Sequence, residues 1–535
     1  ECPALELVTY ERQATLCDIL RAKGYHVAGE DFLEASEPAG FDRVLNYAAK
    51  DVDATLRLWR LQSNQIRAQN LDRILDIDLG TMPMLDHIMA TGMRIDGPAL
   101  LALADEWHEV VVETDAQINA LVIERWQERA VQEVERALDD GREPETWAVR
   151  PLDPAVARIN PASTQQLARV LYEHFGLPVQ TQKGGSITTD EDAIKRLQVI
   201  SPHPVLGLIL KRRHYDKLDG TYARPLPALM DENGRVHPTL KHTRTSTGRL
   251  ASEAPNLQNL PIRDEKDGIK VRRAFVASPG HVLLCCDLAQ VEVRVMAHES
   301  QDPVLIQALI DGVDMHRLTP ARMYGIRVED VTRELRAVGK ILNFGVMYGL
   351  GADGLATNMK WFLADGITPD TTRGQEAIDA YFNSYKGVYN WIQRTQAFAL
   401  DHGYVADMFG RRRWLPQIYS TKRGIANKAL REAINQPIQS GAQGIIKIAM
   451  GKLWRTKVAL GLDDIWIINQ VHDELIEEVP EGDWIEPALI TKDAMETAVE
   501  LSVPVLATVK KGPNWGDAVE VDWDKDGNEI GGEAA

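Results

Sequence analysis

Two adjacent acids, Asp473 and Glu474, are the residues of this sequence with the clearest chemical potential. They follow the apolar run 465–468 and precede Leu475 and Ile476, a pattern that predicts two short strands with the acids at the turn between them. Carboxylates that lose water need a counter-charge, and a divalent cation that also holds substrate phosphates would supply one. On its own such a pair is more often a solvated turn, so the prediction depends on a second carboxylate elsewhere.

The second carboxylate is Asp287, which ends the apolar run 282–286 and so lies at the end of a predicted core strand. An acid in that position is costly without a role. Asp287 and Asp473 can converge from two strands on a pair of cations about 4 Å apart, which would serve an in-line phosphoryl transfer. The alternative is that Asp287 only caps the helix that follows it.

Between these acids the sequence predicts a helix with cations and aromatic rings on one face. Residues of these kinds recur at every fourth position: Arg336, Lys340, Phe344 and Tyr348. Each step of four residues advances only about 40° around a helix, so the four side chains share a face. Asp330 or Thr332 can cap the start of the helix, and Gly349 can end it. This face can hold a triphosphate and a base, and the alternative is an amphipathic helix with buried rings and solvated cations.

The composition is that of an ordinary globular chain with an acidic balance. Its 535 residues suffice for two to four domains, and 44% apolar and 26% charged residues are typical of folded proteins. No run reaches the roughly 18 apolar residues of a membrane span, and no signal peptide opens the sequence. Cys285 and Cys286 fit buried thiols in a reducing compartment. A net charge of −18 would disfavour nucleic acid if it were uniform, but basic residues cluster at 211–213, 263–273 and 411–413.

The elements that must position these residues lie in segments that differ in composition and periodicity. Residues 1–65 and about 80–235 show helical periodicity, and the very polar stretch 124–145 predicts a solvent-exposed helical insertion. Residues 236–263 are rich in Thr, Ser, Asn, Gly and Arg, whose donors suit phosphates and base edges. A simple surface loop of that length would be unusual in a compact domain. The tail beyond Asp522 is predicted to be disordered.

The order of acid, cationic helix and acid pair closely resembles the family A DNA polymerases, the group related to bacterial DNA polymerase I. Three motifs match in order: Asp287-Leu-Ala-Gln290-Val-Glu292-Val-Arg294, Arg336-x3-Lys340-x3-Phe344-x3-Tyr348-Gly349 and Val471-His472-Asp473-Glu474. Further signatures surround them: Thr247-Gly248-Arg249-Leu250, Pro255-Asn256-Leu-Gln258-Asn259, Asp314-Met-His316, Phe409-Gly410-Arg411-Arg412-Arg413 and Asn435-x3-Gln439. The resemblance covers residues 80–520. One departure is that the first motif reads Asp-Leu-Ala-Gln where Asp-Tyr-Ser-Gln is usual, so Ala289 lacks a hydroxyl and could alter nucleotide selection.

The resemblance implies an α+β fold shaped like a right hand, with a palm built on an antiparallel sheet and with helical fingers and thumb. We expect the thumb at 66–235 with an insertion at about 124–155, the palm at 236–300 and 426–522, the fingers at 301–425 and a disordered tail at 523–535. Residues 1–65 resemble the C-terminal remnant of an RNase H-like 3′–5′ exonuclease domain, in which Tyr47 and Asp51 match the last site motif. Residues 1–46 supply no further site acids in a suitable setting, so we expect no proofreading by this chain alone.

The resemblance implies that the chain would add dNTPs to a primer 3′-hydroxyl on a DNA template and release pyrophosphate, in replication or repair. Asp287 and Asp473 would ligate two Mg²⁺ ions, for which Mn²⁺ can substitute, with the Leu288 carbonyl as a further ligand. Glu474 would be a supporting acid, and Lys340 would donate a proton to the pyrophosphate. The residues expected to contact the incoming nucleotide are Gln290, Glu292, His316, Arg336, Lys340, Phe344 and Tyr348, of which Glu292 would exclude a ribose 2′-hydroxyl.

The resemblance also implies contacts with a primer–template. The residues expected to contact DNA are Arg249, Asn256, Gln258, Asn259, Arg263, Arg431, Asn435, Gln439 and His472. Minor-groove contacts suit a polymerase, because the degenerate pattern of that groove accepts every correct base pair. Replisome proteins and a separate exonuclease chain are further candidate partners. We expect a monomer without membrane attachment, in the cytoplasm of a bacterium or of a phage-infected host.

Two other functions fit parts of the pattern. A single-subunit RNA polymerase shares the palm and its metal acids, but the pattern Gln290-x-Glu292 favours deoxynucleotides. A DNA-binding clamp that has lost its chemistry would not need Asp287, Lys340 and Asp473 together.

Overall fold

The computed structural model describes residues 38–149, 158–182, 184–261, 266–363, 368–462, 466–523 and 529–530. The chain forms two compact units, residues 1–72 and 73–535. The first unit contains helix α2 (Pro38–Ala68), on which Tyr47 and Asp51 lie. No helix in the described part of the chain is long and apolar enough to cross a membrane.

The second unit is built on a five-stranded antiparallel sheet. In spatial order its strands are β11 (Val519–Glu520), β10 (Ala507–Gly512), β5 (His281–Leu288), β9 (Glu474–Pro480) and β8 (Trp466–Val471). Side chains alternate across a strand, so Leu284 and Cys286 of β5 enter one core while Leu283 and Cys285 enter another. A central strand buried on both faces accounts for the continuous apolar run in the sequence. The predicted α+β class and antiparallel sheet are confirmed.

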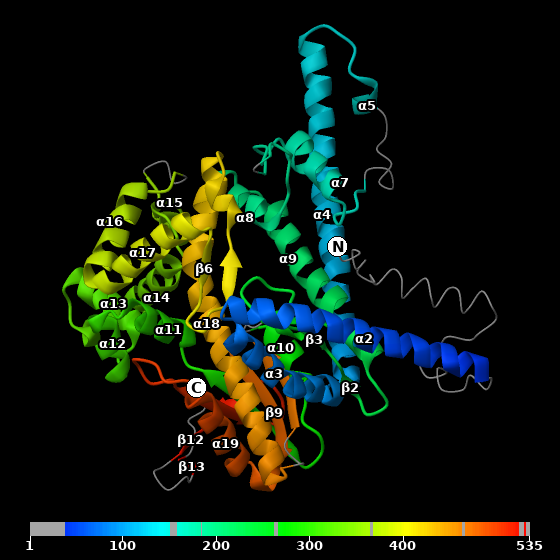
Figure 1. Cartoon of the computed structure of the whole chain (residues 1–535). Helices are drawn as coiled ribbons and strands as arrows, with labels where there is room; N and C mark the ends of the chain where they lie inside the picture. Colours follow the sequence, from blue (N-terminus) through cyan, green and yellow to red (C-terminus); the bar gives the residue numbers. More distant parts are fainter. Residues whose placement is uncertain are drawn as a thin grey trace, which may run out of the picture. The chain divides into compact units, whose positions relative to one another are not determined.

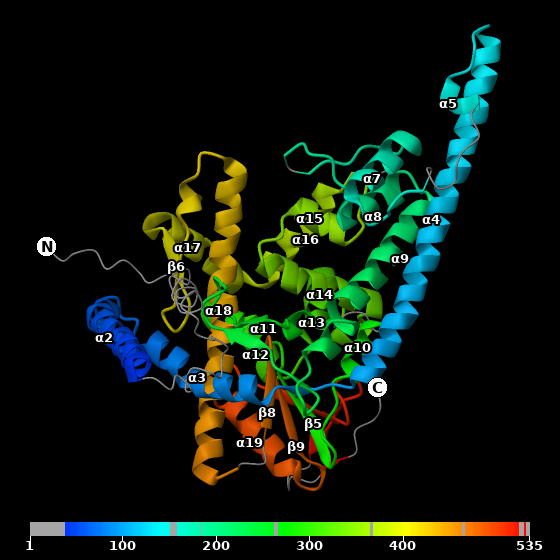
Figure 2. The ribbon, with the colours of Figure 1, turned by 90° about the vertical axis from the view of Figure 1, so that its right-hand side faces the viewer.

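Two helices cover one face of this sheet. They are α18 (Arg423–Leu460) and α19 (Ile485–Glu496), and their apolar residues share a core with Leu284 and Leu475 of the sheet. Figure 1 and Figure 2 both show α18 running from the hairpin β6 (Tyr404–Ala406)–β7 (Arg412–Trp414) down to the sheet. One helix therefore connects two distant parts of the unit.

A group of helices of very different lengths precedes the sheet in sequence. It comprises α3 (Asp72–Thr91), α4 (Gly97–Asp139), α5 (Thr146–Val149), α7 (Thr164–Arg169), α8 (Glu191–Ile200) and α9 (Pro204–Leu218). Asp96 caps α4, because its side chain accepts from the N–H of Ala99 at 2.9 Å. The helix α4 packs along α9 and continues through the polar stretch 124–139 (Figure 1). The helical character predicted for that stretch is therefore present.

A second helical group follows β5. It comprises α11 (Val291–Ser300), α12 (Pro303–Ile310), α13 (Met315–Tyr324), α14 (Arg333–Met347), α15 (Ala352–Asn358), α16 (Thr371–Ser384) and α17 (Lys386–His402). Thr332 caps α14 by accepting from the N–H of Leu335 at 3.3 Å, and Gly349 follows its end with φ 71°. Both were among the predicted end signals. Gly339 lets α13 approach closely, since a Cβ there would lie 2.1 Å from the carbonyl oxygen of His316.

The remaining described elements are short, and one of them corrects the sequence analysis. They are β1 (Met93–Arg94), β2 (Arg235–Val236), β3 (Thr239–Lys241), β4 (Ala251–Glu253), α10 (Gly268–Arg273), β12 (Asp522–Trp523) and β13 (Glu529–Ile530). The tail predicted to be disordered is ordered in part, because β12 pairs with β13. The buried Val521 anchors this segment by donating its N–H to the carbonyl of Val509 at 3.0 Å. The apolar residues near position 521 form too short a pattern to have indicated in the sequence that Val521 would be buried.

Candidate active site

Three carboxylates meet at one end of the central sheet. The pairing of β5 with β9 sets Asp287 opposite Glu474, and Asp473 lies in the two-residue turn between β8 and β9. The N–H of Leu288 donates to the carbonyl oxygen of Asp473 at 3.1 Å, which holds the strand ends together. His472, the other turn residue, has φ 57°. The structure thus brings together the acids that the sequence placed 186 positions apart.

The two aspartates are held without a full counter-charge. Burial raises the pKa of Asp287 to about 7, the charges of Asp473 and Glu474 add to the shift, and Lys510 opposes it. Burial also raises the pKa of Asp473. A bound cation would relieve both the repulsion and the lost hydration, so the side chains fit a metal-ligating role.

The site supplies too few acids to enclose a cation by itself. Within the described ranges, no group of three or more His, Cys, Asp or Glu side chains is arranged to hold a metal ion. Mg²⁺ suits such a site, because it keeps several waters and is commonly bound by one or two carboxylates together with substrate phosphates. The donor set therefore fits an ion that arrives with its substrate.

Glu474 differs from the aspartates because it has a cationic neighbour. Nη2 of Arg272 lies 3.7 Å from Oε2 of Glu474, and the same guanidinium stacks over Trp515 at 4.2 Å from the ring centroid. Burial raises the pKa of Glu474, while Arg272 and Lys510 oppose the rise. Arg272 lies in the basic cluster 263–273, but no sequence motif includes Trp515 or pairs Arg272 with Glu474. The pairing fits the supporting role expected for Glu474.

The chain turns sharply after β5 and places a second acid near the first. Gln290 adopts φ 52° and accepts, through its carbonyl, from the N–H of Arg294 at the start of α11. Arg294 is buried and its Nε donates to the carbonyl of Ala289 at 2.7 Å, which fixes the turn. Glu292 then faces Arg249, whose Nη2 lies 2.7 Å from Oε1. Burial raises the pKa of Glu292, and Arg249 opposes the rise.

The cationic helix α14 presents the expected face. Its opposite side carries the buried Leu342 and Val346, whereas Phe344 and Tyr348 are only partly buried and Lys340 is exposed. This exposure is not that of an amphipathic helix with its rings in the core. Cations and rings are therefore accessible from the same side of α14.

Neighbouring side chains fix both ends of that face. Nε of Arg336 donates to Oδ2 of Asp314 at 2.7 Å. The centroid of the His316 ring lies 5.5 Å from that of the Phe344 ring. Nδ2 of Asn343 lies 3.2 Å from Nδ1 of His316. Burial lowers the pKa of His316, the charge of Asp314 opposes this shift, and the charges of Arg336 and Lys340 reinforce it. His316 is thus held neutral beside the helix, where it can donate or accept a hydrogen bond.

The C-terminal end of α14 meets α18. A Cβ on Gly349 would lie 2.9 Å from Cγ of Arg431, so glycine permits Arg431 to pack against the chain just after α14. One turn further along α18, Oδ1 of Asn435 is buried and has no hydrogen-bond partner among the described residues. A buried acceptor of this kind calls for a ligand or water. Gln439, the next turn on, is partly buried.

A groove of about 910 Å³ runs beside these elements and contains part of the predicted DNA surface. Its wall includes Lys195, Lys217 and Lys266 with Asn259 and His472. Two acids, Glu191 and Asp267, line the same groove, and Glu191 pairs with Lys195 at 2.5 Å. The lysines outnumber the acids by one, which leaves a small positive excess on an acidic protein.

Gln258 also lines this groove, and the remaining residues predicted near it differ in exposure. Asn256 is exposed and accepts from the N–H of Gln258 at 3.1 Å. Gln258 is buried and donates its amide to Gln470 at 3.1 Å, so its side chain is occupied within the protein. Arg263 lies outside the described residues.

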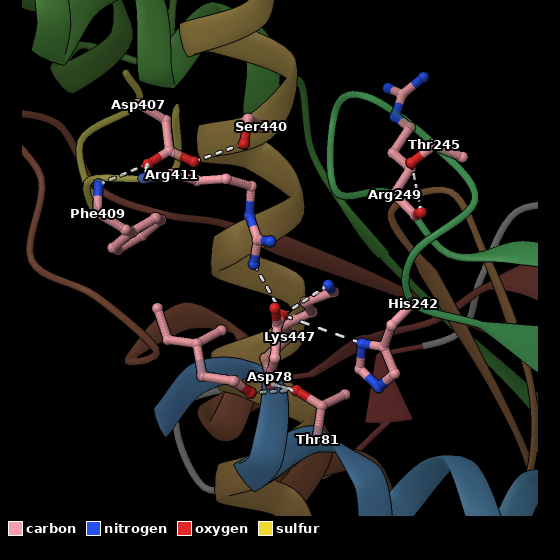
Figure 3. Close-up of polar contacts among 11 residues, drawn as sticks. Asp78, Thr81, His242, Thr245, Arg249, Asp407, Phe409, Arg411, Ser440 and Lys447 are labelled. Atoms are coloured by element: carbon pink, nitrogen blue, oxygen red, sulfur yellow. Dashed lines mark hydrogen bonds and ion pairs between the residues drawn. The ribbon is translucent and has the colours of Figure 1, made fainter. Parts of the chain in front are cut away.

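A buried charge cluster supports the loop that carries Arg249 (Figure 3). Oδ1 of Asp78, from α3, accepts from Nη2 of Arg411 at 2.7 Å and from Nζ of Lys447 at 2.8 Å. Burial opposes ionisation, but the two cations hold the pKa of Asp78 below its usual value. A Cβ on Gly248 would lie 2.8 Å from Nε of Arg411, so the loop packs flat on this guanidinium. The sequence indicated Arg411 and Gly248 but missed Asp78 and Lys447.

Comparison with known proteins agrees with this geometry. Residues 139–517 match the model of DNA polymerase family A. The chain is 35% identical to DNA polymerase I of Caldicellulosiruptor bescii over 86% of its own length and 49% of that protein, and 37% identical to the thermostable DNA polymerase I of Thermus filiformis over 81% and 47%. A solved structure, the POL domain of Pol1 from M. smegmatis in complex with DNA primer-template and dNTP, matches with a TM-score of 0.75 and 31% identity, over 86% of this chain and 74% of that one. The chain spans about half the length of the curated relatives it matches.

Proposed function

Because this chain belongs to DNA polymerase family A, we propose that it is a template-directed DNA polymerase that extends a primer 3′-hydroxyl with dNTPs. Its right-hand polymerase fold, expected from the sequence, is confirmed by the match to the solved polymerase domain. The observation that carries the proposed activity is the convergence of Asp287 and Asp473 from adjoining strands, with raised pKa values.

The acids would hold the metal ions of the reaction. Asp287 and Asp473 would ligate two Mg²⁺ ions, or Mn²⁺ in their place, with the Leu288 carbonyl as a further ligand. Bound there, the ions would lower the pKa of the primer 3′-hydroxyl and neutralise charge on the leaving pyrophosphate. Glu474, already beside Arg272, would support this arrangement without being a principal ligand.

The helix α14 would hold the incoming nucleotide. The primer oxygen attacks the α-phosphate and pyrophosphate leaves, so negative charge grows on the leaving group. Arg336 would bind the phosphates, and the exposed Lys340 would donate a proton to the pyrophosphate. Phe344 would pack on the sugar and base, with His316 fixed beside it. Tyr348 would stack near the templating base.

Selection of deoxyribose would depend on Glu292. This side chain is partly buried and held by Arg249 at 2.7 Å, so it cannot move aside without breaking an ion pair. A rigid carboxylate at that place would exclude a 2′-hydroxyl both by its volume and by loss of the Arg249 contact. Gln290 would contact the same nucleotide from the preceding turn.

The primer–template would lie along the lysine-lined groove. Asn259 and His472 line it directly, while Asn256 is exposed nearby on the same chain segment. Asn435 would contribute its unpartnered buried acceptor, with Arg431 and Gln439 on either side of it along α18. The acceptor and donor groups named here suit minor-groove edges, which are similar for all correct base pairs.

Primer extension with a Mg²⁺ salt tests the proposal. We expect wild-type extension with dNTPs and, for Asp287→Ala, a loss of at least about 10³-fold in rate with primer–template binding retained. A matched control is Glu477→Gln, because Glu477 lies on the same sheet and burial also raises its pKa to about 7, yet it bonds to Thr491. Normal extension by Asp287→Ala, or equal use of rNTPs and dNTPs by wild type, would contradict the proposal.

A further inference from the structure

Four buried polar side chains form a chain of hydrogen bonds where α13 packs on α14. They are Tyr385, between α16 and α17, Thr319 and His316 of α13, and Asn343 of α14. None of the four has more than 5% of its surface exposed. The hydroxyl oxygens of Tyr385 and Thr319 lie 2.9 Å apart, and Oγ1 of Thr319 donates to Oδ1 of Asn343 at 2.7 Å. A buried polar chain that is connected in this way specifies one arrangement of its side chains.

The close approach of the two helices brings Asn343 into this chain. Gly339 lies against the backbone of His316, where a Cβ would be 2.1 Å from the carbonyl oxygen. Asn343 follows Gly339 by about one helical turn, so it faces α13 as well. In sequence it lies between Lys340 and Phe344, which are proposed to contact the nucleotide. The hydrogen-bonded chain is therefore placed next to the nucleotide site.

One backbone carbonyl fixes the orientation of the Asn343 amide. Nδ2 donates to the carbonyl oxygen of Met315 at 2.9 Å, and a carbonyl oxygen can only accept. Oδ1 therefore faces Thr319, whose hydroxyl donates its proton to it. Because that proton is used, the Thr319 oxygen accepts from the hydroxyl of Tyr385. The donor and the acceptor of each bond in the chain are thus determined.

The second hydrogen of the same amide nitrogen determines the tautomer of His316. Nδ2 of Asn343 lies 3.2 Å from Nδ1 of His316. An amide nitrogen donates and does not accept, so Nδ1 must be the acceptor and cannot carry a proton. The neutral ring then has its N–H at Nε2. Nε2 has no hydrogen-bond partner among the described residues, so this N–H is left for a ligand.

The charges around the ring act in the same sense as this tautomer. Burial lowers the pKa of His316, Asp314 opposes the shift, and Arg336 and Lys340 reinforce it. A hydrogen bond donated to Nδ1 also favours the neutral ring, because a proton on Nδ1 would face another donor. Burial raises the pKa of Tyr385 to about 12, so its hydroxyl stays a donor. His316 is therefore an uncharged donor, which is complementary to a phosphate oxygen.

We propose that Asn343, held by Thr319 and Tyr385, is a positioning residue that keeps the proton of His316 on Nε2 for donation to a phosphate oxygen of the incoming nucleotide. The inference rests on the proposed polymerase function, because that function supplies the phosphate. His316 would tighten nucleotide binding without adding charge to the site. Asn343 would act only through His316.

A double-mutant cycle on single-nucleotide insertion tests this role. Asn343→Leu nearly keeps the side-chain volume and removes the amide. We expect it to raise the KM for dNTP by about tenfold, as for the loss of a hydrogen bond to a charged group, with a change in kcat of less than about threefold. In a His316→Ala background, Asn343→Leu should have almost no further effect on KM. Additive effects of the two substitutions would show that Asn343 does not act through His316, and would overturn the inference.

Thr319 provides a second pair of variants, which leave the amide in place. Thr319→Val removes the donor to Oδ1 of Asn343 and should also raise the KM for dNTP, whereas Thr319→Ser keeps a hydroxyl and should restore it. Thr114→Val is the matched control, because Thr114 is a fully buried helix threonine whose hydroxyl bonds to Val110 of the same helix. It should leave KM unchanged. A Thr319→Ser variant as impaired as Thr319→Val would contradict the hydroxyl chain.

NMR of ¹⁵N-labelled histidine measures the tautomer without any turnover. The signals of His316 are those that disappear in His316→Gln. Wild type without nucleotide should show a neutral His316 ring with its proton on Nε2 at pH 7, and Asn343→Leu should raise the pKa of His316 toward its usual value. A proton on Nδ1 in wild type would overturn the inference, whether or not the protein extends a primer. Failure of wild type to insert a nucleotide would instead count against the polymerase proposal, and the tautomer would still decide the positioning role of Asn343.

Discussion

Replacing Asp287 by Asn should stabilise the metal-free protein above pH 7 while it abolishes nucleotide insertion. The carboxylate of Asp287 is held near Asp473 and Glu474, and its pKa rises from 3.8 to about 7. Folding therefore makes ionisation of this group less favourable. Asparagine has nearly the same shape and no charge, so it avoids the free-energy cost of ionising a buried group.

The magnitude follows from the pKa. A rise from 3.8 to about 7 is worth about 4 kcal/mol at 1.36 kcal/mol per unit, and partial exposure of Asp287 reduces this to about 2–4 kcal/mol. The sign is fixed by proton binding. Between pH 4 and pH 7 the folded state holds a proton that the unfolded state has lost, so the free energy of unfolding falls as pH rises through this window. The Asp287→Asn variant should not show this decrease in the free energy of unfolding.

Thermal unfolding followed by circular dichroism, in EDTA at pH 4.5 and pH 8, measures the difference. We expect the midpoint of Asp287→Asn to exceed that of wild type by roughly 2–6 °C at pH 8 and to approach it at pH 4.5. Added Mg²⁺ should raise the wild-type midpoint more than that of the variant, because binding to the folded state stabilises it. The reasoning is refuted if Asp287→Asn is no more stable than wild type at pH 8 in EDTA.

Asp78→Asn is the matched control, since Asp78 is also a partly buried aspartate. Arg411 and Lys447 hold its pKa below the usual value, so its ionised form contributes stability that is present above pH 4 and lost as pH falls. The same substitution should therefore destabilise the protein at pH 8, and the difference should shrink toward acid pH. If Asp→Asn stabilises the protein at position 287 and destabilises it at position 78, the effects come from the charge of the side chain and not from its shape.

Three further outcomes can be measured on the same substrates. Lys340→Ala should lower the rate of single-nucleotide insertion by about 10²–10³-fold with little change in DNA affinity, and the loss should be smaller with a leaving group of lower pKa. Glu292→Ala should raise incorporation of rNTPs relative to dNTPs by at least about tenfold, whereas unchanged discrimination would remove Glu292 from sugar selection. Gly339→Ala should destabilise the packing of α13 on α14 by at least about 1–3 kcal/mol, since its Cβ would lie 2.1 Å from the carbonyl oxygen of His316; a soluble, fully active variant would contradict the close approach.

The sequence predicted the parts of the site that depend on local patterns. Alternation and apolar runs located β5, β8 and β9, and so placed Asp287 and Asp473 at strand ends. Four-residue spacing and end signals located α14 and the face it presents. Each of these features is encoded within about twenty consecutive residues, where periodicity is informative.

Side chains that interact across a long separation in the sequence could not be predicted from local patterns. Asp78 meets Arg411 and Lys447 across more than three hundred positions, and no local pattern marks an acid on α3 as the counter-charge of a distant arginine. Gln258 is a second case, because its amide donates to Gln470, 212 positions away, and nothing in its motif indicated that partner. Pairing across a fold depends on topology, which a single sequence specifies only indirectly.

The acids on the sheet differ in the partners that the fold provides for them. Glu478 of β9 is fully buried but lies 2.5 Å from Nη2 of Arg235, and Glu477 bonds to Thr491. The protein thus provides its own partner for each structural acid, as burial of an ionisable group requires. Burial alone raises the pKa of Glu477 to about 7, whereas the charges of neighbouring acids add to the rise for Asp287. Asp287 and Asp473 therefore differ in lying together at the strand ends, where their charge is left to be balanced from outside. We expect Asp287→Asn to stabilise the metal-free fold and Glu478→Gln to destabilise it. That result would show that Glu478 contributes to stability, whereas Asp287 is retained at the expense of stability because the proposed catalysis needs it.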